Sequence, residues 1–388
     1  MVRVRVAAQA PGLGDAESPK TEPGQGHHGK RGKSLFVSEP TPEEAQALLS
    51  SKYGLDDAGV LPLGSGKVNR SFLVTPKGGP ERLVLQFLSP VFLKSPALGT
   101  NPERVSLRLS ERGMACPSIV PALDGSLLAD AGGFERLLRL STYLPGTHPE
   151  EGEPSEARDC GRALGRTHSA LNQPLPLPLE PLPRGGEYTN QRLPSREDFL
   201  DFHTLYRLHP KLSLIEDQLE RGAALAAALP GNPAFQKVFL LKDLAIHCDP
   251  KRDNFLGESP DYSLIDWDTV GYGDPLIDVA ELCRSFAVRR EPPFFDKDLA
   301  REAVLGYQET GIPLSKEHYR LLPPTIRAIA LNLGRRYLAD ALLENYFVWD
   351  KERYPSHFEQ DTERAEALFG LAEELMLREM EFYDMWTG

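Results

Sequence analysis

The stretch 238–286 constrains the fold of this chain more than any other part of its sequence. It holds two short apolar runs, 238–241 and 262–265, of the length that buried strands have. A turn rich in Gly and Pro follows the second run, and an apolar helix comes next. The polar side chains after the runs are His247, Asp249 and Asn254, then Asp266 and Asp268. The pattern predicts two strands, each of which delivers polar groups at its end.

The spacing H-x-D-x-x-x-x-N, followed by an apolar strand that ends in Asp, fits phosphoryl transfer. This chemistry needs a carboxylate that orients the attacking hydroxyl and accepts its proton, and Asp249 suits that task. It also needs oxygen ligands for Mg²⁺, and Asn254 and Asp266 suit that one. Mg²⁺ takes few protein ligands and keeps several waters, so one carboxylate and one amide are enough. Asp268 is a further candidate, for a second metal or for the acceptor.

These motifs resemble those of the aminoglycoside phosphotransferase and choline kinase-like superfamily. The usual H-G-D loop appears here as His247-Cys248-Asp249. The longer strings HCDPKRDNFL, LIDWDTV and DVAELCRSF are more similar to the bacterial N-acetylhexosamine 1-kinase group. The resemblance covers roughly residues 45 to 380 and is densest in 236–286.

The resemblance implies an α+β, bilobal protein kinase-like fold. Residues 39–140 would form a small β-rich N-terminal lobe that binds the nucleotide. Residues 141–388 would form a mostly helical C-terminal lobe with the catalytic loop and the acceptor site. Residues 1–38, rich in Gly, Pro, Lys and His, lie outside the resemblance, and we expect a disordered tail there.

The implied reaction moves the γ-phosphoryl of ATP, with GTP as the alternative donor, to a sugar hydroxyl with the help of Mg²⁺. The acceptor would be the anomeric hydroxyl of an N-acetylhexosamine or a related hexose. Arg284, in the R-S pair of the helix after the motif, and Arg336, in a string resembling G-x-R-F-L-x-D, are candidate substrate residues. A surface salt bridge is the alternative for Arg336. His247 would brace the metal-binding strand, and Asp278 would hydrogen-bond the catalytic loop.

The sequence features expected to bind the nucleotide are less distinctive than the motif around Asp249. Gly64, Ser65 and Gly66, with Asn69, could form a glycine-rich loop over the phosphates, although a Gly-Ser-Gly hairpin turn is common. Most kinase-like folds carry a phosphate-gripping Lys where this chain has Gln86. Lys94 could replace it, but a solvated surface lysine is the favoured reading. Ser141 and Tyr143 lie in a stretch, 141–146, that resembles the connector whose backbone binds adenine.

Composition bounds the remaining possibilities. The net charge of −12 argues against broad binding to nucleic acid or to anionic membranes, which need a basic surface. The four cysteines show no C-x-x-C spacing, which favours reduced thiols rather than zinc ligands. The chain has no apolar run long enough for a transmembrane helix and no apolar core of a signal peptide, so we expect a cytoplasmic protein.

Other elements follow from local signals. Thr41, followed by Pro42 and two acidic residues, predicts a helix start. Apolar runs predict strands on both sides of the Gly-Ser-Gly turn and over 83–86 and 134–140. Apolar residues at helical spacing predict a series of helices in the rest of the chain. The predicted helices after residue 150 are 155–171, 214–229, 326–347 and 359–382. The proline-rich segment 173–196 could contact the acceptor through Glu187 or Asn190.

Two rival interpretations remain open. Another small-molecule kinase, for an aminoglycoside, choline or homoserine, would keep the Asp249 site and differ in its acceptor loops. Alternatively, the chain could be a non-catalytic nucleotide-binding pseudokinase. Gln86 favours that second reading, and the intact set of Asp249, Asn254 and Asp266 opposes it. The exact sugar, the choice between ATP and GTP, and the oligomeric state cannot be fixed from the sequence, because fold membership does not fix the substrate.

Overall fold

The computed structural model describes residues 40–64, 69–79, 81–89, 95–134, 136–181, 192–344 and 346–387. Several predictions therefore fall outside the described residues. They concern the tail 1–38, Ser65 and Gly66 of the glycine-rich turn, Lys94, and the acceptor candidates Glu187 and Asn190.

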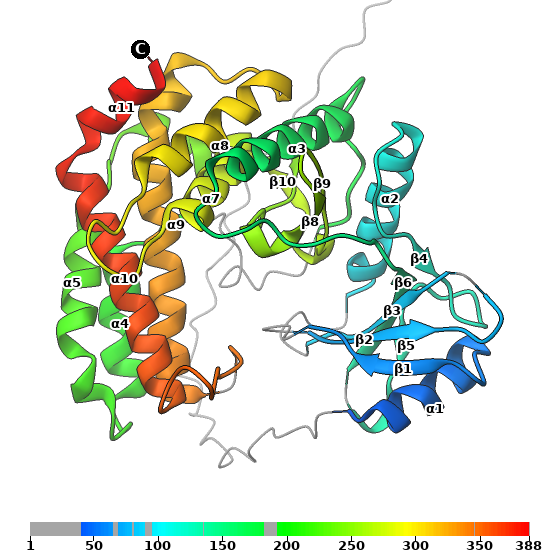
Figure 1. Cartoon of the computed structure of the whole chain (residues 1–388). Coiled ribbons are helices and arrows are strands. Elements are labelled where there is room, and N and C mark those ends of the chain that lie inside the picture. Colours follow the sequence, from blue (N-terminus) through cyan, green and yellow to red (C-terminus); the bar gives the residue numbers. More distant parts are fainter. Residues whose placement is uncertain are drawn as a thin grey trace, which may run out of the picture. The chain divides into compact units, whose positions relative to one another are not determined.

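An antiparallel sheet dominates the N-terminal part. Its order is β1 (Gly59–Pro62), β2 (Arg70–Thr75), β3 (Leu83–Phe87), β6 (Leu137–Thr142) and β4 (Ile119–Val120), with β5 (Ala129–Asp130) also pairing with β6. Figure 1 shows α1 (Pro42–Tyr53) beside this sheet. Alternation along β2 and β3 buries Phe72, Val74 and Leu85 in one core with Leu49 of α1.

The predicted start of α1 is confirmed. Oγ1 of Thr41 accepts the N–H of Glu44 at 3.2 Å, and the Glu44 carboxylate accepts the N–H of Thr41 at 2.8 Å. This reciprocal capping box satisfies two backbone donors that the first helical turn leaves without partners. Gly54 ends the helix in the left-handed conformation with φ of 70°.

Helices make up most of the chain after β6. They are α3 (Pro154–Asn172), α4 (Arg196–Tyr206), α5 (Glu216–Ala227), α6 (Pro233–Leu240), α7 (Pro275–Ala287), α8 (Lys297–Thr310), α9 (Lys316–Leu343), α10 (His357–Leu377) and α11 (Glu379–Thr387); α2 (Ala97–Glu111) precedes β4. Two hairpins interrupt them: β7 (Leu244–Ile246) pairs with β10 (Gly271–Gly273), and β8 (Phe255–Glu258) pairs with β9 (Asp261–Leu264). The predicted α+β class, strands first and helices after, is confirmed.

Some predicted boundaries were wrong. The apolar run 238–241 is the end of α6 rather than a strand, because Asn232 caps that helix at Phe235 N–H and Pro233 starts it. The strand that precedes His247 is β7. The predicted strand 134–140 is shifted to β6. The helix predicted over 326–347 begins at Lys316 and continues through two prolines, and the terminal helix is divided at Arg378.

Two glycines allow α3 and α8 to approach closely. A Cβ on Gly306 would lie 1.9 Å from the carbonyl oxygen of Arg158, and one on Gly161 would lie 2.1 Å from that of Ala303. Both obstacles are backbone atoms of the facing helix, so no side-chain rotation relieves them. The spacing of these helices therefore depends on the missing side chains. Among the described residues, no helix is both long and apolar enough to span a membrane.

A buried polar cluster joins α9 to α10. Asp340 accepts the backbone N–H groups of Tyr346 and Phe347, each at 2.7 Å. Nε2 of His357 lies 2.9 Å from Oδ2 of Asp340 and 3.2 Å from Oδ2 of Asp361. These three side chains have the residue types and spacing of metal ligands. Asp340 is already engaged by two backbone donors, however, so fixing the segment after α9 accounts for its burial.

We expect Gly306→Ala to destabilise the protein by at least about 1–3 kcal/mol, because it forces α3 and α8 apart. Thermal unfolding of the variant should show a clearly lower midpoint than the wild type. Gly231→Ala is the matched control, since a Cβ there meets no atom within 4 Å. Equal midpoints for Gly306→Ala and Gly231→Ala would contradict the close approach of the two helices.

We expect Asp361 to make stability pH-dependent. Burial raises the pKa of Asp361 to about 8; Asp340 adds to this effect, whereas Gln360 and Arg364 oppose it. The folded state therefore binds more protons than the unfolded state between about pH 4 and pH 8. The free energy of unfolding should fall as pH rises through this window, by at most about 1.4 kcal/mol per pH unit.

Denaturant unfolding at several pH values would measure this effect. Asp361→Asn, which mimics the neutral acid, should flatten the profile and be more stable than the wild type above pH 8. Glu352→Gln, at an exposed position, should keep the wild-type profile. An unchanged profile in Asp361→Asn would assign the pH dependence to other groups.

Candidate active site

Asp278, in the first turn of α7, anchors the backbone of the loop 247–254. Its fully buried carboxylate accepts the N–H groups of His247 at 2.7 Å and Cys248 at 2.8 Å. Nε2 of His168 on α3 lies 2.9 Å from the same carboxylate. The structural role predicted for Asp278 is confirmed. Cys248 has φ of 70°, the left-handed region that favours glycine, which accounts for the usual Gly of the H-G-D loop.

The His247 ring ties this loop to the end of β9. Nε2 of His247 lies 2.9 Å from the carbonyl oxygen of Ile265, and Nδ1 lies 3.3 Å from the N–H of Asp249. A carbonyl only accepts, so Nε2 carries the proton and Nδ1 accepts. Burial lowers the pKa of His247, in agreement with a neutral ring. His247 thus holds the residue immediately before Asp266, which is the bracing role expected of it.

Asp249 lies where cations and an amide converge. Lys251 pairs with its Oδ2, and Nδ2 of Asn254 lies 2.8 Å from its carbonyl oxygen and 3.3 Å from Oδ2. Burial opposes the ionisation of Asp249, but the charges of Lys251 and Arg336 outweigh it and hold its pKa below the ordinary value. The carboxylate is therefore ionised near neutral pH.

Asp266 is a partly buried carboxylate with one enclosed oxygen. It follows β9 with φ of 65°, and its Oδ1 has no hydrogen-bond donor among the described residues. Burial and the neighbouring Asp268 raise the pKa of Asp266 to about 6, against the influence of Lys251 and Arg139. A buried carboxylate oxygen without a donor is costly unless a cation binds it. The site therefore fits Mg²⁺, with Asp266 and the amide oxygen of Asn254 as the oxygen ligands.

Asp268 takes part in a network with the sheet. Arg139 of β6 pairs with its Oδ1, and Nδ2 of Asn69 donates to its Oδ2 at 2.9 Å. Oδ1 of Asn69 accepts the N–H of Ser89 at 2.9 Å. Both oxygens of Asp268 and both ends of the Asn69 amide are thus engaged inside the protein. The ligand roles expected of Asp268 and Asn69 stay predictions.

The remaining nucleotide candidates are spread over the sheet. Gly64, with φ of 64°, ends the described part of the glycine-rich turn. Gln86 faces Arg139 across β3 and β6, and Ser141 is buried on β6. The backbone N–H of Tyr143 donates to the carbonyl oxygen of Arg82 at 2.9 Å. This N–H is therefore already hydrogen-bonded within the protein. The connector continues to Thr147, which pairs with Gly257 of β8.

The two arginine candidates differ. Arg284 is buried and donates to Glu281 on its own helix through Nε at 2.8 Å and Nη2 at 2.6 Å, so most of its guanidinium is committed. Arg336 on α9 is partly buried, and its charge helps to lower the pKa of Asp249. The structure therefore brings Arg336 into the electrostatic environment of Asp249, whereas it gives Arg284 an internal partner.

Two residues of the site were missed at the level of sequence. Lys251 pairs with Asp249, and both Asp249 and Asp266 help to raise its pKa above that of an ordinary lysine, although burial acts in the opposite direction. Its signal was present, as the Lys of the D-P-K string. Arg139 carried no local signal, because its partners Gln86 and Asp268 are distant in the sequence.

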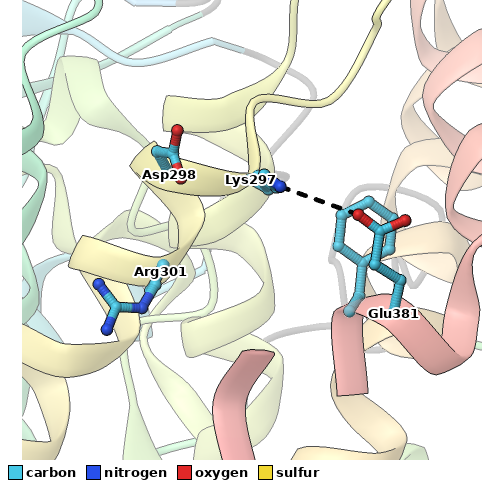
Figure 2. Close-up of a pocket in the computed structure, with 5 residues that line it drawn as sticks. Lys297, Asp298, Arg301 and Glu381 are labelled. Carbon is cyan, nitrogen blue, oxygen red and sulfur yellow. Dashed lines mark ion pairs between the residues drawn. The ribbon is translucent and has the colours of Figure 1, made fainter. Parts of the chain in front are cut away.

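A surface hollow of about 160 Å³ lies elsewhere, lined by Lys297, Asp298, Arg301, Glu381 and Phe382. Figure 2 shows Lys297 directed from α8 toward Glu381 of α11, with the charged atoms 3.8 Å apart. The residues that line this hollow all lie outside the stretch 238–286. The hollow therefore contributes nothing to the site built around Asp249.

Comparison with known proteins gives a consistent result. Residues 59–311 match the phosphotransferase enzyme family. A homoserine kinase from Rhizobium etli is 28% identical over 242 residues, which cover 61% of this chain and 67% of that protein. The crystal structure of an aminoglycoside phosphotransferase from Alicyclobacillus acidocaldarius matches with a TM-score of 0.55 and 16% identity, over 90% of this chain and 99% of that chain.

An amicoumacin kinase, solved in complex with AMP-PNP and Ca²⁺, matches with a TM-score of 0.53 and 15% identity, over 82% of this chain and 88% of that chain. These structures confirm the kinase-like fold expected from the sequence. The narrower resemblance to N-acetylhexosamine 1-kinases stays a prediction. The family match includes the sheet from β1 onward, the loop 247–254, Asp266 and α7. The chain therefore belongs to the phosphotransferase enzyme family, and it is a kinase-type enzyme that transfers phosphate to a hydroxyl group.

Proposed function

We propose that this enzyme transfers the γ-phosphoryl of ATP to a hydroxyl of a small sugar, most specifically the anomeric hydroxyl of an N-acetylhexosamine. One observation carries the catalytic part of the proposal. Asp249 is an ionised carboxylate hydrogen-bonded to Asn254, and Asp266 offers a buried oxygen without a donor among the described residues. A base and two oxygen ligands are the groups that phosphoryl transfer to an alcohol requires.

Asp249 would orient the acceptor hydroxyl and accept its proton. The depressed pKa keeps the carboxylate ready to accept a hydrogen bond from the hydroxyl at neutral pH. The charge of Lys251 interacts with both Asp249 and Asp266. Lys251 would offset the negative charge of the transferred phosphoryl group. Asn254 fixes the Asp249 carboxylate through its amide N–H, which leaves the amide oxygen as a ligand atom.

Asn254 and Asp266 would hold Mg²⁺, which when bound neutralises charge on the nucleotide phosphates. His247 positions the strand end that carries Asp266 through the carbonyl of Ile265. The protein would therefore supply two oxygen ligands, from Asn254 and Asp266, and a base, Asp249, that are already positioned before the nucleotide binds. These roles make ATP the expected donor, with GTP as the alternative nucleotide.

The sugar assignment is supported by the motif strings around Asp249 and by Arg336 in its electrostatic environment. A cationic acceptor such as choline or an aminoglycoside is less compatible with an arginine there. Homoserine is the second candidate, because a homoserine kinase is among the relatives of this chain and a carboxylate is a natural partner for arginine.

We expect Asp249→Asn to lower turnover by on the order of 10² to 10⁴, because the base is lost while the hydrogen-bonding shape is kept. ADP release with ATP, Mg²⁺ and acceptor would measure it. Asp261→Asn, at an exposed position at the start of β9, should retain wild-type turnover. Turnover of Asp249→Asn near that of the wild type would remove Asp249 from the mechanism.

We expect ADP release to be stimulated by an N-acetylhexosamine in a panel that also contains hexoses, homoserine, aminoglycosides and choline. Arg336→Gln should raise KM for the acceptor and leave KM for ATP unchanged, because Arg336 is proposed to contact only the acceptor. Stimulation by homoserine alone would keep the catalytic site and replace the sugar. No stimulation by any member, with Mg²⁺-nucleotide still bound, would favour a non-catalytic protein.

A further inference from the structure

Gln86 and Arg139 form a pair on one face of the sheet. The two residues are directly opposite in the register of β3 and β6. Nε of Arg139 lies 3.2 Å and Nη2 lies 2.8 Å from Oε1 of Gln86. A guanidinium has only donors, so the oxygen of the Gln86 amide must face Arg139. The amide N–H₂ of Gln86 is therefore directed away from Arg139, in a single orientation.

Arg139 joins Gln86 to the turn that follows Asp266. Arg139 pairs with Asp268, which is two residues after Asp266, and its charge acts to lower the pKa of Asp266. Gln86 is only partly buried, whereas Arg139 is 4% exposed. Gln86 is therefore the member of the pair that is more accessible to a ligand.

Arg139 itself is fully committed to internal partners. Besides Gln86, it donates to the carbonyl of Leu98 at the start of α2 at 3.0 Å and pairs with Asp268. Three rigid attachments on β3, α2 and the turn after β9 leave it no freedom to follow a ligand. Arg139 can act on a nucleotide only by way of the residue it orients.

We propose that Nε2 of Gln86 donates a hydrogen bond to a phosphate oxygen of the nucleotide, and that Arg139 is the positioning residue that holds the amide in this orientation. The inference rests on the proposed function and deepens it on the nucleotide side. The neutral amide contacts the anion, and the buried guanidinium behind it polarises the amide in the direction that strengthens donation. The charge of Arg139 is balanced by Asp268, so the pair contributes an oriented amide donor rather than a net positive charge.

Calorimetric titration of the full chain with AMP-PNP and Mg²⁺ tests the contact without any acceptor. Gln86→Glu keeps an oxygen for Arg139 and replaces the donor with an acceptor of the same shape. We expect roughly 10- to 100-fold weaker binding, the range for losing a hydrogen bond to a charged group. Gln236→Glu, which adds the same charge at an exposed position on α6, should bind like the wild type.

A double-mutant cycle tests the positioning role. Arg139→Lys retains a cation for Asp268 but loses the two-point hold on Gln86, so it should weaken binding in the wild-type background. In the Gln86→Ala background it should have no further effect, because there is no amide left to orient. An equal effect in both backgrounds would show that Arg139 acts independently and would overturn the positioning role.

The outcomes separate the two proposals. If the wild type binds AMP-PNP with Mg²⁺ and Gln86→Glu binds it equally tightly, the phosphate contact is overturned and the proposed kinase function still stands. Failure of the wild type to bind Mg²⁺-nucleotide would overturn both. Weaker binding by Gln86→Glu together with coupling in the cycle would support the Gln86–Arg139 unit. Thermal unfolding of each variant should confirm that it is folded at the titration temperature.

Discussion

The catalytic loop depends on one buried carboxylate. Asp278 accepts two consecutive backbone N–H groups of the loop and lies within hydrogen-bond distance of His168, so it joins α7, α3 and the end of β7. The His247 backbone that it fixes carries the ring that holds Ile265, the neighbour of Asp266. A chain of short contacts thus runs from α7 to Asp266, the carboxylate proposed to bind the metal. Losing Asp278 would leave several buried donors without partners, which costs more than one hydrogen bond.

Carboxylates of similar chemistry take different tasks here because their surroundings differ. Lys251 and Arg336 keep Asp249 ionised against its burial. Asp266, beside Asp268 and without a donor among the described residues for one oxygen, has a raised pKa. Asp268 is neutralised by Arg139. Environments that push neighbouring pKa values apart are what separates a base from a ligand. The charge arrangement therefore favours Asp249 as base and Asp266 as ligand.

The sequence predicted the catalytic loop well because its signals are local. The order of motif residues, the capped start of α1 and the helix α3 all rest on spacing within one element. The run 238–241 was mistaken for a strand because periodicity cannot separate a short apolar run in a strand from one in a helix. Asn232 and Pro233 were the local signals that could have corrected it. The bounds of α9 to α11 were missed because packing overrides local breakers such as the prolines inside α9.

The pair of Gln86 and Arg139 shows what a linear pattern omits. At the level of sequence, a Gln at the usual position of a Lys reads as a lost charge and argues for an inactive protein. In the fold, β6 places an arginine directly opposite Gln86, and strand register, which no local motif encodes, brings the two together. An arginine of the neighbouring strand thus contacts Gln86, and its charge is balanced by Asp268. A Gln at the usual position of a Lys is therefore held by a specific partner in the fold and is not by itself an argument for an inactive protein.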